Sequence, residues 1–399
     1  MLQRCKSATQ LSKSNLANAA RSKDQHATRE ADLLFMTTKW NMLDIQHIGE
    51  GVVGIVYMAT MNDPSSKNDF TKRKRVVAKR SVILTAEQRH RHTFDDPERD
   101  AKILIQLNAM NENKGHPHIV RLVDFVVDKE RSLLWTVTEY GGKDMYEVLH
   151  SLRDTPSQAF SESTAKSIAL QLGTTLLQLH KWGTAHLDIG CENILLEPID
   201  DKNQEWHARF CDFGMAYQCV FEKDGNWQNV CDRFGGKFAC MSPEQVTHAN
   251  QHMTHAKQKA RIVKKYNTAA TAAVTSDASV KEYKQKMQEA GQKRLAELKA
   301  TGYDARAADV FAWGSIVFHM VCGCPPFTRA CPDSCPDYRV ILNGKLAWVI
   351  KSWKCQPLTP ECTDFMQQIL TASPENRIDI ATWLAHPWFQ GRSAPVTPA

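Results

Sequence analysis

The chain has 399 residues, 42% hydrophobic and 24% charged, which allows one or two well-packed folded units. No run of about 18 apolar residues occurs, and the N-terminus lacks the apolar centre of a secretory signal, so no membrane span and no secretion are predicted. We therefore expect a cytoplasmic protein, with an organelle transit peptide as the alternative because the start is acid-free and contains Arg and Ser.

Residues 1–41 are predicted to be a mobile, basic extension, because their composition is rich in Ser, Ala, Lys, Gln and Asn. Residues 1–23 hold five basic and no acidic side chains, and residues 246–300 have a net charge of +7. Since the whole chain carries only +6, the remainder must carry −6. Such basic segments either meet an acidic or phosphate-bearing partner or form a solvated helix face, and we predict no nucleic-acid binding.

From Met42 onward, short apolar runs with glycines predict the strands of an antiparallel sheet. A helix is predicted from Pro97 to Met110, because its Ile and Leu residues recur at helical spacing. One helix among several strands describes a small β-rich lobe over about residues 42–138. The predicted strands are residues 45–48, 52–58, 76–78, 119–127 and 133–137.

Past Gly142 the pattern becomes mostly helical, and apolar helices are predicted over residues 165–181 and 309–322. A basic insertion over about residues 246–301 has no strand pattern and includes an amphipathic helical stretch. We therefore expect an α+β chain of two lobes, the second over about residues 142–390, with a short tail of residues 391–399.

Gly49, Gly51 and Gly54 form a Gly-x-Gly-x-x-Gly run between two predicted strands. A dinucleotide-binding turn or a plain hairpin uses the same glycines. A dinucleotide site, however, needs a helix directly after the third glycine, whereas residues 55–58 continue as a strand. The run therefore predicts a loop whose backbone amides approach phosphates.

Residues 186–193 read His-Leu-Asp-Ile-Gly-Cys-Glu-Asn, and Asp212-Phe213-Gly214 follows nineteen positions after Asn193. Together they resemble the phosphoryl-transfer centre of the protein kinase family. Further motifs in family order cover about residues 42–390, and two of them are similar to the calcium/calmodulin-dependent group. The resemblance implies a bilobal protein kinase fold, ATP and Mg²⁺ as cofactors, and transfer of phosphate to Ser or Thr of a protein substrate.

The same resemblance implies individual roles. Asp188 takes the proton of the substrate hydroxyl, while Asn193 and Asp212 hold the metal ions. Lys79 pairs with the α and β phosphates and is held by a carboxylate, for which Asp100 replaces the family Glu, with Glu98 as the alternative if the local alignment shifts. The other expected nucleotide contacts are Gly49, Gly51, Gly54, Val56, Ala78, Thr138, Glu139 and Tyr140.

Two further motifs imply supporting contacts. Glu244 and Arg377 are expected to form a buried ion pair, because they occupy the family's anchor positions. The segment that starts at Asp309 is expected to support the catalytic loop.

Besides Asp100, the family pattern is broken at three places. Gly190 replaces the Lys two residues after the catalytic Asp, which predicts a rate lower by roughly one to two decades. Leu187 replaces an Arg that grips an activation-segment phosphate, and residues 218–241 contain no Ser, Thr or Tyr. Lys237 stands where Ser/Thr kinases have Thr, and we hypothesise that it reaches Asp188 and restores the cation, the other interpretation being a surface lysine.

The sequence therefore predicts an atypical Ser/Thr protein kinase that needs no activation-loop phosphorylation. The alternative is a pseudokinase that acts as a nucleotide-binding or scaffold module. The retained Asp188, Asn193 and Asp212 favour catalysis, whereas Gly190, Leu187 and Asp100 favour the alternative.

Overall fold

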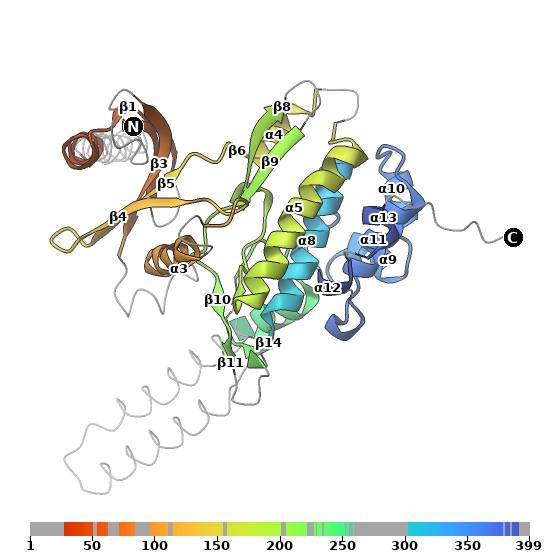
Figure 1. Ribbon diagram of the computed structural model, residues 1–399. Helices are drawn as coiled ribbons and strands as arrows, with labels where there is room; N and C mark the ends of the chain where they lie inside the picture. The colour runs from red at the N-terminus through yellow and green to blue at the C-terminus, as the bar shows by residue number, and fades with distance from the viewer. Residues whose placement is uncertain are drawn as a thin grey trace, which may run out of the picture. The chain divides into compact units, whose positions relative to one another are not determined.

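The computed structural model divides the chain into two compact units (Figure 1). The first comprises Met1–Ile83 and Arg121–Tyr140, and the second comprises Leu84–Val120 and Gly141–Ala399. The residues that the structure describes are 28–50, 54–62, 72–83, 96–110, 115–154, 158–200, 205–221, 227–228, 230–233, 235–251, 253–254, 258, 302–377, 380–383 and 385–390.

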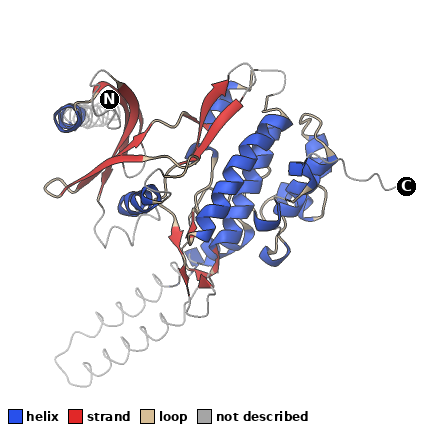
Figure 2. Ribbon diagram, viewed as in Figure 1, coloured by secondary structure: helices blue, strands red, loops and turns tan. Residues whose placement is uncertain are grey.

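The first unit contains a five-stranded antiparallel sheet of order β1-β2-β3-β5-β4, drawn in red in Figure 2. All five predicted strands are confirmed, although their ends differ by several residues. Ile119 was expected in the fourth strand but instead forms a bridge to Phe210 of the second unit. The strands are β1 (Leu43–Glu50), β2 (Gly54–Asn62), β3 (Arg73–Val82), β4 (Leu122–Asp128) and β5 (Leu133–Glu139).

A helix over residues 28–40 packs on one face of this sheet, which differs from the expected mobile extension up to residue 41. Asp32, Met36 and Trp40 are spaced by four and so share one helix face. All three are buried, Met36 and Trp40 in a core cluster with Tyr57 and Trp135. The polar composition of the N-terminal region concealed this short apolar stripe.

The second unit is built on two long helices in contact, α5 (Glu162–Lys181) and α8 (Ala305–Cys322) (Figure 1). The Ser161 and Asp304 side chains cap the helix N-termini by accepting backbone N–H bonds, and Gly323 ends α8 with a φ of 73°. The shorter helices are α3 (Pro97–Ala109), α4 (Met145–Ser151), α9 (Pro336–Leu342), α10 (Leu346–Ser352), α11 (Pro360–Ile369), α12 (Ile380–Trp383) and α13 (Pro387–Gln390), with 3₁₀ turns η1 (Cys191–Asn193) and η2 (Pro374–Asn376).

Short strands, which the sequence did not predict, frame the loops of this unit. β6 (Lys143–Asp144), β8 (Ile194–Asp200) and β9 (Glu205–Phe210) form one sheet, in which Ile194, Leu196, Ala208 and Phe210 are fully buried at alternate positions. The remaining pairs are β7 (Thr184–Ala185) with β10 (Tyr217–Gln218), β11 (Val220–Phe221) with β12 (Trp227–Gln228), and β13 (Val230–Cys231) with β14 (Tyr303–Asp304).

The predicted insertion is described only at its start, where a helix begins at residue 243. Most of residues 246–301 lies outside the described part of the chain, as does the tail of residues 391–399. No helix among the described residues combines the length and the apolar character needed to cross a bilayer.

Candidate active site

The catalytic loop follows β7, and its backbone is held by Asp309 of α8. The N–H groups of His186 and Leu187 donate to the two Asp309 carboxylate oxygens at 2.7 and 2.8 Å, and His180 Nε2 lies 3.0 Å from Oδ2. Asp309 is 1% exposed, so these bonds form away from water. The prediction that this helix supports the catalytic loop is confirmed.

Asp188 is oriented by Asn193 from the end of the same loop. Asn193 Nδ2 donates to the Asp188 backbone oxygen at 2.8 Å and to its Oδ2 at 2.6 Å. The Asn193 N–H in turn donates to Gly190 O at 3.0 Å, which closes the η1 turn. Because the Asn193 amide nitrogen donates both bonds to Asp188, its side-chain oxygen is the atom that could bind a cation.

His186 links this loop to the Asp212–Gly214 segment. The Asp188 N–H donates to His186 Nδ1 at 3.3 Å, which leaves Nε2 to donate to Cys211 O at 3.2 Å. Complete burial lowers the pKa of His186, consistent with a neutral ring in this tautomer. The His186 ring also lies 4.8 Å from the fully buried ring of Phe213. The side chains around the base therefore form one connected core.

Asp212 adopts the left-handed backbone conformation, with a φ of 63°, and its Oδ1 accepts the Gly214 N–H at 3.3 Å. A non-glycine residue at positive φ is uncommon and is held there by its surroundings. Asp212 and Asn193 present a carboxylate and an amide oxygen, the hard ligands that Mg²⁺ prefers. These donors fit a magnesium ion, which would neutralise phosphate charge when bound.

Asp100 of α3 holds the Asp212–Gly214 segment from the other side. Its Oδ1 accepts the Phe213 N–H at 2.8 Å, and Asp100 is 5% exposed. The Asp96 N–H and Arg99 Nη1 both donate to Gly214 O, at 3.0 and 2.6 Å. These bonds explain why α3 belongs to the second unit, whereas the sequence placed it in the β-rich lobe. The predicted Lys79–Asp100 pairing remains a prediction, because the two residues lie in different units.

In the first unit, strand register assigns the predicted nucleotide contacts to faces. Lys79 of β3 lies opposite Val56 and Thr136, while Val77 lies opposite Thr138. Because alternate residues share a face, these five side chains project from the same side of the sheet.

The expectation for Ala78 is corrected. Ala78 is fully buried on the opposite face, in the cluster with Met36, Trp40 and Tyr57. Val77, one residue earlier, is the neighbour that shares the face of Lys79.

The space around the glycine run differs from one glycine to the next. A Cβ on Gly54 would lie 2.3 Å from Arg80 O, so only glycine fits there, whereas Gly49 has no such neighbour. Gly51 lies outside the described residues.

The residues at the end of β5 contact basic side chains of β3. Glu139 pairs with Lys74 at 2.9 Å, and the Arg75 guanidinium lies 4.1 Å from the centre of the Tyr140 ring.

Lys237 of the activation segment reaches the catalytic loop. Its Nζ lies 3.1 Å from Asp188 Oδ2 and 3.8 Å from Glu192 Oε2. Burial lowers the pKa of Lys237, but the two carboxylates outweigh that effect and raise it above its ordinary value. Lys237 therefore carries a full positive charge beside Asp188. The sequence did not predict Glu192 as a second partner.

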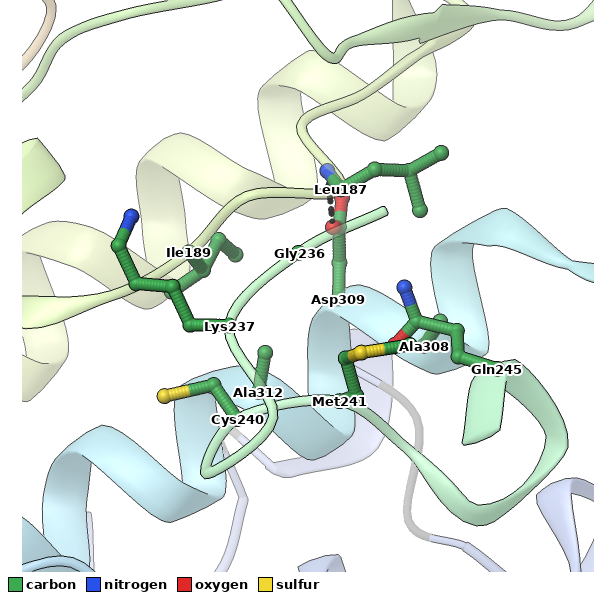
Figure 3. A pocket seen from close by; sticks show the side chains of 10 residues that line it. All are labelled: Leu187, Ile189, Gly236, Lys237, Cys240, Met241, Gln245, Ala308, Asp309 and Ala312. Atoms are coloured by element: carbon green, nitrogen blue, oxygen red, sulfur yellow. Dashed lines mark hydrogen bonds between the residues drawn. The ribbon is translucent and has the colours of Figure 1, made fainter. Parts of the chain in front are cut away.

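The activation segment packs closely between the catalytic loop and α8, as Figure 3 shows. A cavity of about 10 Å³, room for about one water molecule, remains between Leu187, Gly236, Met241 and Asp309. At the end of the segment, Glu244 accepts two bonds from Arg377, at 2.8 and 3.0 Å, and the Arg377 side chain is 1% exposed. The predicted ion pair is confirmed.

A buried Asp holding a catalytic loop, an Asp–Asn pair within that loop and a strained Asp-Phe-Gly turn define a phosphoryl-transfer fold. The protein kinase domain model matches residues 42–259 and 294–389. The chain belongs to the protein kinase family.

Curated relatives agree with this assignment. Serine/threonine-protein kinase cds1 of Schizosaccharomyces pombe is 24% identical over 347 residues, 86% of this chain and 57% of the relative. Serine/threonine-protein kinase fused of Drosophila melanogaster is 25% identical over 346 residues, 86% of this chain and 31% of the relative. Human serine/threonine-protein kinase ULK3 is 23% identical over 281 residues, 70% of this chain and 44% of the relative. The chain thus spans about a third to just over half of the length of these relatives.

Proposed function

We propose that the chain transfers the γ-phosphoryl group of ATP to Ser or Thr hydroxyls of protein substrates, with Mg²⁺. The observation that carries this proposal is the double hydrogen bond from Asn193 to Asp188 on a loop fixed by Asp309. It orients the carboxylate that takes the hydroxyl proton. Asn193 and Asp212 would hold the metal, and Lys79 would pair with the nucleotide phosphates.

We also propose that this activity needs no phosphate on the activation segment. Residues 218–241 contain no Ser, Thr or Tyr, so Tyr217 is the sole hydroxyl between Asp212 and Met241. The position of the phosphate-gripping Arg is filled by Leu187, which is 6% exposed and packs in an apolar cluster. Residues 218–241 thus offer no hydroxyl that could carry a phosphate, and the Arg that would bind this phosphate is also missing.

The second candidate is a pseudokinase that holds nucleotide and acts as a scaffold. The ion pair between Lys237 and Asp188 favours it, because the ammonium group engages one oxygen of the carboxylate that would accept the hydroxyl proton. The basic segment of residues 246–300 would then offer a surface to an acidic or phosphate-bearing partner.

A transfer assay with γ-labelled ATP, Mg²⁺ and a panel of basic and acidic test proteins separates the two candidates. We expect label on Ser or Thr with the wild-type chain, none with Asp212→Asn, and an unchanged rate after phosphatase treatment. Melting-temperature shifts on addition of ATP and Mg²⁺ measure nucleotide binding in parallel. Nucleotide binding without any transfer would reject the kinase and select the scaffold.

A further inference from the structure

The side chain of Lys237 fills the space beside Gly190. A Cβ built on Gly190 would lie 2.4 Å from Lys237 Cδ and 3.0 Å from Cε. The Gly190 backbone, at φ −160° and ψ 162°, is extended and open to any residue. The backbone would therefore accept any residue, and it is the Lys237 side chain that a larger residue at position 190 would have to displace.

Lys237 is fixed at both ends. Its backbone oxygen accepts the N–H groups of Cys240 and Met241, at 2.7 and 2.9 Å, which sets the origin of the side chain. Its Nζ lies between Asp188 and Glu192, and the side chain extends toward the segment that carries Ile189 (Figure 3). The Lys237 side chain thus connects the activation segment to the catalytic carboxylate.

We propose that Lys237 takes the role of the lysine that the family has at position 190, so that the activation segment, and not the catalytic loop, provides the cation. We call this arrangement the exchange. This inference rests on the proposed kinase function. As the substrate oxygen bonds to the γ-phosphorus and the bond to the β-phosphate oxygen breaks, the hydroxyl proton passes to Asp188. Lys237 keeps its own proton throughout and stabilises the negative charge of the transferring group.

Glu192 takes part in this arrangement as a positioning residue. Its Oε2 lies 3.8 Å from Lys237 Nζ, and its side chain is 53% exposed, so it holds the ammonium from the solvent side. Asp188 is the nearer carboxylate and accepts a hydrogen bond from Nζ at 3.1 Å, and Glu192 adds a second negative charge beside the ammonium group.

Four variants test the exchange through turnover. Lys237→Met keeps the length of the side chain but removes its charge, and we expect kcat to fall about ten- to a hundredfold with little change in KM for ATP. Gly190→Lys alone should also lower kcat, because two lysines compete for one space. The double variant Gly190→Lys with Lys237→Thr returns the cation to the catalytic loop, and it should exceed Lys237→Thr by at least about tenfold.

Lys351→Met serves as the matched control, because Lys351 is an exposed lysine on α10. It should match the wild-type chain in kcat. Unchanged turnover in Lys237→Met, or no rescue in the double variant, would overturn the catalytic role of Lys237. A lysine that merely held the segment in place would not be rescued from position 190.

Thermal unfolding of the same proteins tests the exchange without an activity measurement. Gly190→Lys should lower Tm by about 2–4 °C or more when residue 237 is Lys and much less when it is Thr. Equal shifts in both backgrounds would overturn the exchange. A wild-type chain that transfers no phosphate would reject only the proposed function, and the Tm comparison would still decide whether residues 190 and 237 share one space.

Discussion

Leu187 is the residue on which the proposed independence from activation-segment phosphorylation can be tested. Its backbone has a φ of 60°, and its side chain packs with Ala185, Cys231, Tyr303 and the start of α8. The Leu187 N–H donates to Asp309, and a Cβ on Gly236 would lie 3.0 Å from the Leu187 oxygen. The Leu187 side chain lies in an apolar cluster, so a guanidinium group in its place would lose its water.

We predict that Leu187→Arg destabilises the chain by about 2 kcal/mol or more, because an unpaired charge is buried. Leu187→Met keeps the volume and the apolar character, and it should cost less than about 1.5 kcal/mol. Urea denaturation followed by circular dichroism measures both. Equal stability of the two variants would show that the site accepts a charged side chain. It would then no longer be true that the site excludes an Arg able to bind a phosphate.

The helix over residues 28–40 is one of the elements that the sequence did not reveal. Tyr57 donates to Asp32 Oδ2 at 2.6 Å, and Arg80 Nε lies 3.0 Å from the same oxygen. Trp40 Nε1 donates to Asp124 at 2.7 Å, and its ring meets Trp135 at 6.1 Å. Polar and aromatic contacts together tie the helix to β2, β3, β4 and β5 of the first unit.

We predict that Trp40→Ala lowers the free energy of unfolding of the first unit by about 3–5 kcal/mol, since a buried aromatic side chain is lost. Leu34→Ala is the control on the same helix, because Leu34 is 68% exposed, and it should change stability by less than about 0.5 kcal/mol. Hydrogen exchange of the β5 amides, read for each variant, reports the stability of this unit. Identical protection in both variants would mean that the helix contributes no packing energy.

At the scale of the whole chain, Glu244 and Arg377 join segments 133 residues apart. Arg377 also donates to Ala307 O at 2.6 Å and to the backbone at Thr371 and Ala372. One buried guanidinium thus connects the end of the activation segment, the start of α8 and the segment after α11.

We predict that Arg377→Met destabilises the chain by about 3–5 kcal/mol, because Glu244 is left without its partner. The double variant with Glu244→Gln should be less destabilised than the sum of the single variants. Denaturation curves of the three proteins give the coupling. Strict additivity would show that the pair contributes no interaction energy.

The fold class and the central site residues could be predicted because they depend on short-range patterns. Strand alternation, helical spacing and family motifs identified β1 to β5, α5, α8 and the Glu244–Arg377 pair. Contacts between distant segments that no family motif marks could not be predicted. The bond from Phe213 N–H to Asp100 spans 113 residues, and nothing in the sequence near Asp100 indicates it.

A shift of one residue was enough to misplace Ala78, because neighbouring strand residues face opposite sides. The reason for glycine at position 190 was likewise hidden, since it depends on the path of the Lys237 side chain. Both points depend on the direction in which a side chain projects, and the sequence alone does not give that direction.

The crowding between positions 190 and 237 also restricts how this sequence can change over generations. A side chain at position 190 meets the methylenes of Lys237, so the effect of any substitution at one position should depend on the residue present at the other. The two positions are therefore expected to tolerate change together more readily than separately.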